Sequence, residues 1–244
     1  MKDIYSALIY KPILNALVFI YNNISLGDLG LAIIILTILF RLVLYPLFQK
    51  QVRYQATMQR IQPKLKKIQQ EHKGDMEKQS QATLAVYKEH NINPFSGFVV
   101  ILIQLPILFA LYHVFVNIFK PEIFSDLYSF IVRPTELNPI FAGFFDLRQH
   151  NYILVFVTAV AQYVQGKLSL GARPVDKNSE DTAQKVGQSM VWMAPLITLV
   201  VFAKLPAAVV LYWLVSTAFS IGQQILVNKQ IQENEHRGIP EKTS

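Results

Sequence analysis

The chain has 244 residues, of which 52% are hydrophobic and 16% charged, and its formal net charge is +7. Ordinary soluble domains carry about 25% charged residues, and the apolar residues of this chain also gather in long blocks, which indicates a polytopic membrane protein. The chain contains no cysteine, so disulfides, thiol catalysis and cysteine metal sites are excluded.

The N-terminal segment, residues 4–20, is apolar but interrupted by Lys11, Pro12 and Asn15. A proline inside a helix removes a backbone hydrogen bond and bends the helix. We therefore predict an amphipathic helix that lies in the membrane interface, with a poor membrane span as the alternative. Met1–Tyr10 lacks the charged region and the cleavage site of a signal peptide, so no removable leader is expected.

The first long apolar run, Leu29–Phe48, contains a single charge, Arg41, which lies seven residues before its end. About 20 apolar residues cross a bilayer, and an arginine near the centre of such a helix costs roughly 2.5–3.5 kcal/mol on insertion scales. Arg41 is therefore a candidate functional residue. The alternative is that its long side chain reaches the headgroups and has no further role.

Residues 49–94 are polar and basic, with nine Lys or Arg against four Asp or Glu. Apolar side chains recur there at steps of three and four residues, which predicts a helix with a narrow apolar seam. Gly74-Asp75 is a turn signal, and a second helix with Leu84 and Tyr87 on one side is predicted to follow it. The pattern indicates a water-exposed helical hairpin. The seam of its first helix consists of Met58, Ile61, Leu65 and Ile68.

The last apolar run, Met190–Leu226, is too long to be one span. As a single helix its 37 residues would measure about 55 Å, whereas the hydrocarbon core is about 30 Å thick. Two spans joined by a turn at residues 204–206 are therefore predicted, which gives an all-α, polytopic protein with a five-helix transmembrane core. The expected division is 1–28 interfacial helix and turn, 29–48 first span, 49–94 basic hairpin, 95–119 second span, 120–150 outer loop with an interfacial segment, 151–168 third span, 169–189 loop, 190–204 fourth span, 206–227 fifth span and 228–244 tail.

Basic residues set the orientation, because loops on the cytoplasmic side carry an excess of Lys and Arg. If the hairpin is cytoplasmic, its side of the membrane holds sixteen Lys or Arg, the opposite side six, and Arg41 lies between them. The hairpin, residues 169–189 and the tail are thus expected in the cytoplasm. The positive charge is a topology signal that flanks the spans, and no direct nucleic-acid recognition is predicted.

Polar side chains within the spans indicate a cavity rather than a catalytic site. The spans contain no Asp or Glu that could pair with Arg41, and Gln104 and Gln165 are expected in the same cytoplasmic half of the membrane. A charge with amides and no counter-ion predicts a wet cavity that opens to the cytoplasm. Singly, uncharged polar residues are typical of contacts between helices. The other such residues are Gln162, Ser216, Thr217 and Ser220.

Enzymatic function is not expected. The spans lack a pair of carboxylates, the H-E-x-x-H zinc motif and a Walker phosphate loop. Ser216 and His113 could form a dyad, but no third group or nucleophile turn accompanies them. No cofactor or metal ion is predicted.

The order of several short motifs resembles one family. The first motif lies in the span that contains Arg41, others lie in the basic hairpin and the spans after it, and the last ones lie in and after the final span, which contains a Tyr-Trp pair. Together they resemble the YidC family of membrane protein insertases, which is related to the mitochondrial oxidase-assembly insertase. The resemblance runs from about Tyr10 to Lys229. The motifs are Tyr45-Pro46-Leu47, Gln62-Pro63-Lys64, Asn93-Pro94-Phe95, Leu102-Ile103-Gln104-Leu105-Pro106-Ile107, Leu211-Tyr212-Trp213 with Ser216, and Gln223-Gln224.

This resemblance implies a five-helix core around a hydrophilic groove that is open to the cytoplasm and lipid and sealed outside. Arg41 matches the arginine of the groove, and Gln165 and Trp213 match other polar positions that line it. Gln104 is added as a candidate groove residue because it is expected in the cytoplasmic half of its span. The basic hairpin corresponds to the element that receives substrates. Its candidate residues are Arg53, Arg60, Lys64, Lys66 and Lys67.

The resemblance also implies the setting: a multi-pass protein of the bacterial inner membrane with a cytoplasmic C-terminus. Its partners would be nascent membrane proteins and the lipid bilayer, with the Sec translocon, the signal recognition particle pathway and the ribosome as further candidates. The large outer domain of some members is not expected, and the short tail of mixed charge argues against ribosome docking through the tail. Two alternatives remain: an assembly chaperone beside the translocon, and a small-solute transporter.

Overall fold

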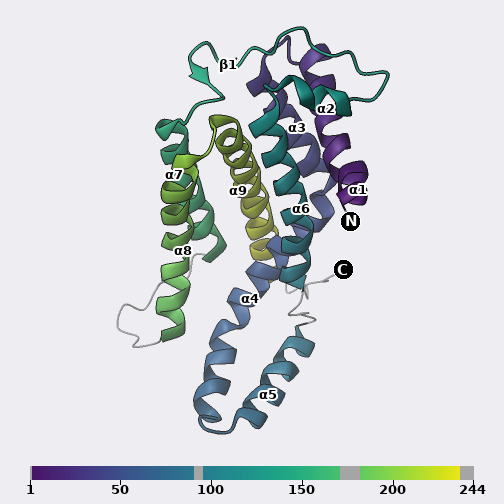
Figure 1. The fold of residues 1–244 in the computed structure, drawn as a ribbon. Helices are drawn as coiled ribbons and strands as arrows, with labels where there is room; N and C mark the ends of the chain where they lie inside the picture. Colours follow the sequence, from purple (N-terminus) through teal and green to yellow (C-terminus); the bar gives the residue numbers. More distant parts are fainter. Residues whose placement is uncertain (1, 91–95, 171–181, 237–244) are drawn as a thin grey trace.

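The computed structural model describes residues 2–90, 96–170 and 182–236, and this part of the chain is mainly helical (Figure 1). The all-α class predicted from the sequence is confirmed, with strands limited to one pair of two residues each. Three stretches lie outside the described residues: 91–95 at the end of the predicted hairpin, 171–181 in the predicted loop 169–189, and 237–244 in the predicted tail. The elements are α1 (Lys2–Tyr5), η1 (Ser6–Tyr10), α2 (Lys11–Asn23), α3 (Leu29–Val43), α4 (Tyr45–Glu71), α5 (Met76–Glu89), α6 (Ser96–Asn117), η2 (Pro121–Asp126), β1 (Ile140–Phe141), β2 (Phe145–Asp146), α7 (Tyr152–Leu170), α8 (Thr182–Val201), η3 (Phe202–Lys204) and α9 (Ala207–His236).

Helix α9 is the centre of the bundle. It packs against α3 and α6 on one side and α7 on the other, and α8 packs against α7. The pair α4–α5 extends from one end of the bundle, and the segment with η2, β1 and β2 covers the opposite end (Figure 1). The long apolar run is divided between α8 and α9 at η3, close to the Lys204-Leu205-Pro206 turn.

The first apolar run is not the single helix 29–48 expected from its composition. Helix α3 ends at Val43, Leu44 leaves the helical conformation, and α4 begins at Tyr45 after a bend of 71°. The cause is Pro46, which has no backbone N–H to donate and whose ring clashes with a carbonyl one turn earlier. This bend turns the start of α4 across the end of α3.

The N-terminal helix is continuous through α1, η1 and α2, and a π-helical turn takes up the irregularity before Pro12. Asn15, which the sequence presents as an interruption, is only 3% exposed. Its amide donates to the carbonyls of Lys11 (2.8 Å) and Asp126 (3.2 Å) and accepts from the N–H of Tyr128 (2.7 Å). Asn15 therefore fixes the outer segment to α2.

The outer segment is also joined to the start of α9. The N–H groups of Ala207 and Ala208 donate to the carbonyls of Gln149 (2.8 Å) and Leu147 (3.1 Å), which satisfies two of the donors that a helix start leaves without partners. The β1–β2 turn rests on α3 at Gly30, where an added Cβ would lie 2.2 Å from the Phe141 ring. Only glycine permits this close approach.

Asp146, at the end of β2, should make the stability of the outer segment depend on pH in the acid range. Arg148 donates from Nε to Oδ1 (3.1 Å) and from Nη2 to Oδ2 (2.9 Å), and this pairing lowers the pKa of Asp146 from about 3.8 to about 2. As the pH falls, the carboxyl of Asp146 takes up a proton earlier in the unfolded state than in the folded state. The contribution of this ion pair to stability is therefore present above about pH 4 and is lost as the pH drops from about 4 to about 2. The measurement is the Tm of thermal unfolding at a series of pH values between 5 and 2. The Tm of Asp146→Asn should fall less with pH than that of the native chain. Equal dependence of Tm on pH in the two proteins would contradict the role of Asp146.

The hairpin α4–α5 is held by a thin apolar contact. Ile61 and Val86 are buried, and Met58, Leu65 and Ile68 pack beside them with Tyr87. Leu84, predicted on one side of the second helix with Tyr87, is 50% exposed, because Val86 and Tyr87 are the side chains of α5 that pack against α4. The root of the hairpin lies on the lower part of α9, where Val52 and Ala56 contact Val227 and Ile231. The hairpin is thus fixed at its root and projects freely beyond it.

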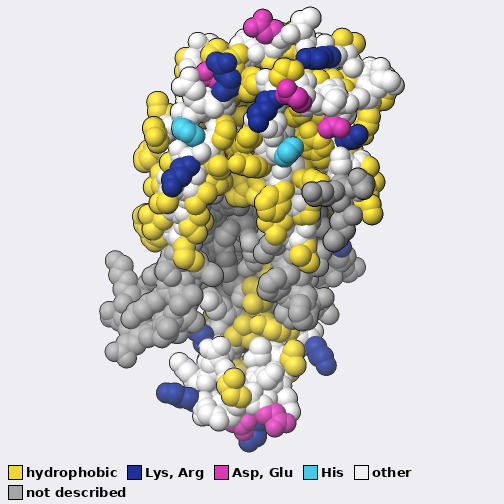
Figure 2. All heavy atoms as spheres, viewed as in Figure 1, with side chains coloured by type: hydrophobic (Ala, Val, Ile, Leu, Met, Phe, Trp, Pro, Cys, Tyr) yellow, Lys and Arg dark blue, Asp and Glu magenta, His cyan; other side chains and the backbone are white. Residues whose placement is uncertain are grey.

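Length and composition, among the described residues, identify one helix that could cross a membrane, Ala207–Glu233, and one bent pair, α3 with the first part of α4. Two shorter apolar helices, Gln104–Asn117 and Val191–Lys204, accompany them. Figure 2 shows a broad band of hydrophobic side chains on one face of the bundle, with charged side chains gathered above it and on the hairpin below. The face in this view is thus apolar along the bundle and charged at both ends.

Candidate functional site

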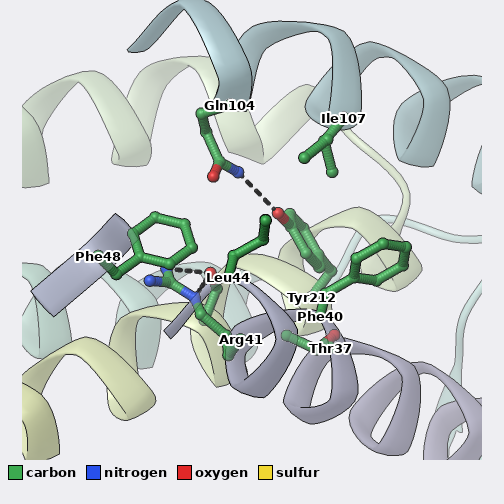
Figure 3. Close-up of a pocket in the computed structure, with 9 residues that line it drawn as sticks. Thr37, Phe40, Arg41, Leu44, Phe48, Gln104, Ile107 and Tyr212 are labelled. Atoms are coloured by element: carbon green, nitrogen blue, oxygen red, sulfur yellow. Dashed lines mark hydrogen bonds between the residues drawn. The ribbon is translucent and has the colours of Figure 1, made fainter. Parts of the chain in front are cut away.

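Arg41 lies in the last turn of α3, and its guanidinium is held by α9 and α4. Its Nε donates to Ser216 Oγ at 2.9 Å, and Nη2 donates to the same oxygen. The Phe48 ring lies against the guanidinium, with Cζ 4.2 Å from the ring centroid (Figure 3). In a straight helix Phe48 would lie about 10 Å further along the axis. The bend at Leu44 therefore creates this cation–π contact.

A small pocket surrounds the guanidinium at the junction of α3, α4, α6 and α9. Above it, Gln104 Nε2 donates to Tyr212 Oη at 3.0 Å (Figure 3). The cavity itself measures about 10 Å³, which is room for about one water molecule. The residues that line it are Thr37, Phe40, Arg41, Leu44, Phe48, Gln104, Ile107, Tyr212 and Ser216.

The charge in this pocket has neutral partners. Ser216 and Tyr212 are 5% and 4% exposed, and no Asp or Glu is among the described residues that line the cavity. A hydroxyl and an aromatic ring stabilise a guanidinium, but they do not neutralise it. In a setting with little water a Coulomb attraction is stronger than in bulk solvent, so any carboxylate close to this guanidinium would be attracted strongly.

Of the four predicted groove residues, the structure brings Arg41 and Gln104 together in this pocket. Gln165 is partly buried on α7, and neither it nor Trp213 is among the residues that line the cavity. Since Trp213 follows Tyr212 directly, a turn of about 100° separates their side chains. Tyr212 faces Gln104, and Trp213 is directed toward α7 and α8.

Trp213 belongs to a separate polar contact between helices. With the Gln162 amide oriented to suit its neighbours, Gln162 Oε1 accepts from Trp213 Nε1 at 2.7 Å, and Nε2 donates to the Ala194 carbonyl at 3.2 Å. The Trp213 ring also meets Phe202 edge-on, with centroids 5.2 Å apart. This contact connects α7, α8 and α9, which is the role the sequence predicts for Gln162.

Phe48 and Tyr212, which contact Arg41 and Gln104 directly, are among the pocket residues that were not expected from the sequence, and Ser216 was expected only as a contact between helices. Tyr212 and Ser216 lie four residues apart, a spacing that places both on one helix face. That signal was present in the sequence. Phe48 gives no such signal, because its position depends on the bend at Leu44.

The five basic residues predicted to receive substrates all lie on α4. Arg53, near the root, donates from Nη2 to Gln230 Oε1 of α9 at 3.2 Å. Lys64 pairs with Glu89 of α5 at 3.1 Å and lowers the pKa of that carboxyl. Lys67 is exposed, whereas Arg60 and Lys66 are partly buried. The structure thus distributes these side chains along the hairpin, with Arg53 and Lys64 in contacts between helices.

No group of three or more His, Asp or Glu side chains is arranged to hold a metal ion in the described part of the chain. Ser216 and His113, which the sequence allowed as a dyad, have different neighbours. Ser216 accepts a hydrogen bond from Arg41, whereas the His113 ring packs edge-on against the Tyr10 ring.

Residues 19–235 match the family described as 60Kd inner membrane protein. Similar proteins include the membrane protein insertase YidC of Syntrophus aciditrophicus, 34% identical over 90% of this chain and 36% of its own length. The insertase MisCA of Bacillus subtilis is 33% identical over 88% of this chain and 76% of its own. YidC of Fusobacterium nucleatum is 31% identical over 91% of this chain and 98% of its own length.

A solved structure, described as an active YidC insertase with the first transmembrane domain resolved, has a similar fold. Its TM-score is 0.56 at 24% identity, and the match covers 89% of this chain and 45% of that one. The chain spans about a third of the length of the Syntrophus relative. The match to the family over residues 19–235 nevertheless covers most of the chain, and the chain therefore belongs to the 60Kd inner membrane protein family, which includes the YidC and MisCA insertases.

Proposed function

We propose that this chain is a membrane protein insertase whose Arg41 pocket attracts acidic extracellular segments of nascent membrane proteins. The observation that carries this proposal is the guanidinium of Arg41, which is held by Ser216 and Phe48 with no carboxylate among the described pocket residues. An arginine kept in apolar surroundings at a cost in stability is a functional-site candidate. The family relationship supports the same function.

The proposed membrane placement uses α3, α6, α7, α8 and α9 as five spans in the bacterial inner membrane. The apolar band in Figure 2 supports it, as does the excess of basic residues on the hairpin and tail. The N-terminal helix then lies at the outer interface, and the hairpin and C-terminus lie in the cytoplasm. Nascent membrane proteins are the proposed partners, with the Sec translocon, the signal recognition particle pathway and the ribosome as further candidates.

The proposed mechanism begins at the hairpin, which receives the substrate, and continues at Arg41. A carboxylate of the substrate replaces Ser216 as the partner of the guanidinium. Since the cavity holds about one water molecule, the helices around it must separate to admit a chain. We propose that Gln165 and Trp213 line the widened groove. The apolar helix of the substrate then enters lipid, which is favourable for about 20 apolar residues, and the membrane potential acts on the acidic segment.

The second candidate is an assembly chaperone that packs the helices of other proteins without inserting them. The outer faces of α7 and α8 favour it, because Phe156, Leu196 and Val200 are 62%, 57% and 67% exposed. Lipid chains would cover these side chains equally well. The chaperone and the insertase differ in whether a substrate crosses the membrane without the translocon.

The test is insertion into liposomes that contain the purified chain and no translocon. A small single-span substrate with an acidic outer segment is added, and protection of that segment from external protease is measured. Protection above that in protein-free liposomes supports the insertase. Protection at the protein-free level, together with improved assembly when the translocon is present, supports the chaperone.

A further inference from the structure

A second recess lies between the N-terminal helix, α6 and η2, and it shares no lining residue with the Arg41 pocket. Its volume is about 640 Å³, within the range of about 300–1,000 Å³ typical of small-molecule sites. On α6, Gln104 and Ile107 face the Arg41 pocket, whereas Phe109, Tyr112 and His113 line this recess. The same helix thus serves two sites at different depths.

Asp126 lies on the polar rim of the recess, and Lys11, which is outside the lining residues, pairs with it. Lys11 Nζ lies 3.2 Å from Asp126 Oδ1, and the two side chains are 38% and 35% exposed. Asp126 is held in place, because its carbonyl accepts from the buried amide of Asn15. The rings of Tyr10 and His113 meet edge-on with centroids 5.1 Å apart. The rim therefore offers a carboxylate and an imidazole beside aromatic faces, with the ammonium group of Lys11 next to the carboxylate.

The π-helical turn of η1 completes the wall of the recess. Tyr5 and Tyr10 both line it, although five residues in an α-helix turn through about 500°, which would leave them about 140° apart. In η1 the N–H of Lys11 bonds to the carbonyl of Ser6, the five-residue step that brings such positions onto one face. Single π-turns are frequent at functional sites. Here the turn directs two tyrosines into one recess.

The recess becomes apolar toward the middle of the bundle. Phe109 and Tyr112 are 62% and 42% exposed. Phe109 lies eight residues before the end of α6 at Asn117, or about 12 Å, whereas His113 lies about 6 Å from that end. Each headgroup layer of a bilayer is about 5–7 Å thick. The polar rim thus lies at headgroup depth and Phe109 among the acyl chains.

We propose that this recess binds one outer-leaflet phospholipid whose headgroup carries both a phosphate and a primary amine. Asp126 and the tyrosine faces take the ammonium, since aromatic cages attract such cations. Lys11 and His113 take the phosphate, and Phe109 lies along an acyl chain. A purely anionic headgroup is a poorer fit, because its charge would meet the carboxylate of Asp126. This assignment rests on the membrane placement proposed above.

An ordinary belt of interfacial aromatics is the competing interpretation, since Tyr is enriched at both membrane surfaces. Such a belt has no preference for one headgroup. Tyr152, at the start of α7, is 70% exposed and lies outside the recess. It is the matched control for Tyr112.

The test is native mass spectrometry of the purified full chain with phosphatidylethanolamine, phosphatidylglycerol or free phosphoethanolamine. One phosphatidylethanolamine should be retained, about fivefold more strongly than phosphatidylglycerol, which is the contribution of one partly exposed ion pair. Tyr112→Ala should lose this lipid and Tyr152→Ala should keep it. Asp126→Asn should reverse the preference toward phosphatidylglycerol, because Lys11 then lacks its counter-ion.

Equal retention of the two lipids, or equal binding by the Tyr112 and Tyr152 variants, would overturn the proposal. Binding of free phosphoethanolamine as strong as that of the lipid would also overturn it. Arg41→Ala should retain the lipid unchanged. The lipid site can therefore fail while insertion proceeds, and insertion can fail while the lipid remains bound, so the two proposals are tested separately.

Discussion

Arg41→Ala is expected to slow insertion of a substrate with an acidic outer segment by about 10- to 140-fold. A charge-assisted hydrogen bond contributes about 1.5–3 kcal/mol, and about 1.4 kcal/mol corresponds to a tenfold change in rate. Alanine removes the guanidinium that Ser216 and Phe48 hold in place. The measurement is the initial rate of protease protection in liposomes with equal amounts of each variant.

The matched control is the substrate. When its acidic residues are replaced by the corresponding amides, the native chain and Arg41→Ala should insert it at similar rates. Arg41→Lys keeps the charge without the planar fork of donors, so it should restore part of the rate. Normal insertion of the acidic substrate by Arg41→Ala would exclude the proposed role of this charge. Thermal unfolding of each variant separates a lost function from a lost fold.

Asn15→Leu is expected to destabilise the protein by about 2–4 kcal/mol, with a fall in Tm of roughly 5–15 °C. The side chains are similar in size, but leucine leaves the N–H of Tyr128 and the carbonyl of Asp126 without their partner in a buried contact. Each such group costs about 1–3 kcal/mol. Thermal unfolding gives the total, and hydrogen exchange at residues 120–130 should rise because η2 detaches from α2.

Asn23→Leu is the control for this substitution. Asn23 makes the same local bond, from its amide to the carbonyl four residues earlier, but at an exposed position. Its replacement should change Tm by less than about 2 °C, as surface substitutions usually do. If the two variants were equally stable, the buried bonds of Asn15 to the outer segment would contribute nothing measurable.

Several local features could be predicted because they depend on residues close together in the chain. The seam of Met58, Ile61, Leu65 and Ile68 follows from the helical repeat. The break near Lys204 follows from length, since no single helix of 37 apolar residues fits a bilayer. Leu84, predicted on one side of α5 with Tyr87, is 50% exposed, because periodicity in a short polar helix leaves the direction of its buried face open.

The candidate site was predictable only in part. Arg41 is conspicuous because a lone charge in an apolar run is expensive wherever it lies. The identity of its neighbours was not predictable, because Ser216 is 175 residues away and Phe48 reaches it only through the bend. Asn15 shows the same limit: a polar residue in an apolar run was interpreted as an interruption, and its partners lie more than 100 residues further on.

The helical class, the apolar runs, the excess of basic residues on one side of the predicted spans and the family resemblance could all be inferred from the sequence. Each of these follows from composition, periodicity or order along the chain. The contacts between polar residues of different helices depend on the folded structure. It placed Gln104 and Tyr212 above Arg41, and it turned Trp213 toward Gln162. The physical reason is that the rotation of each helix about its axis is fixed by packing against α9, which no local pattern encodes.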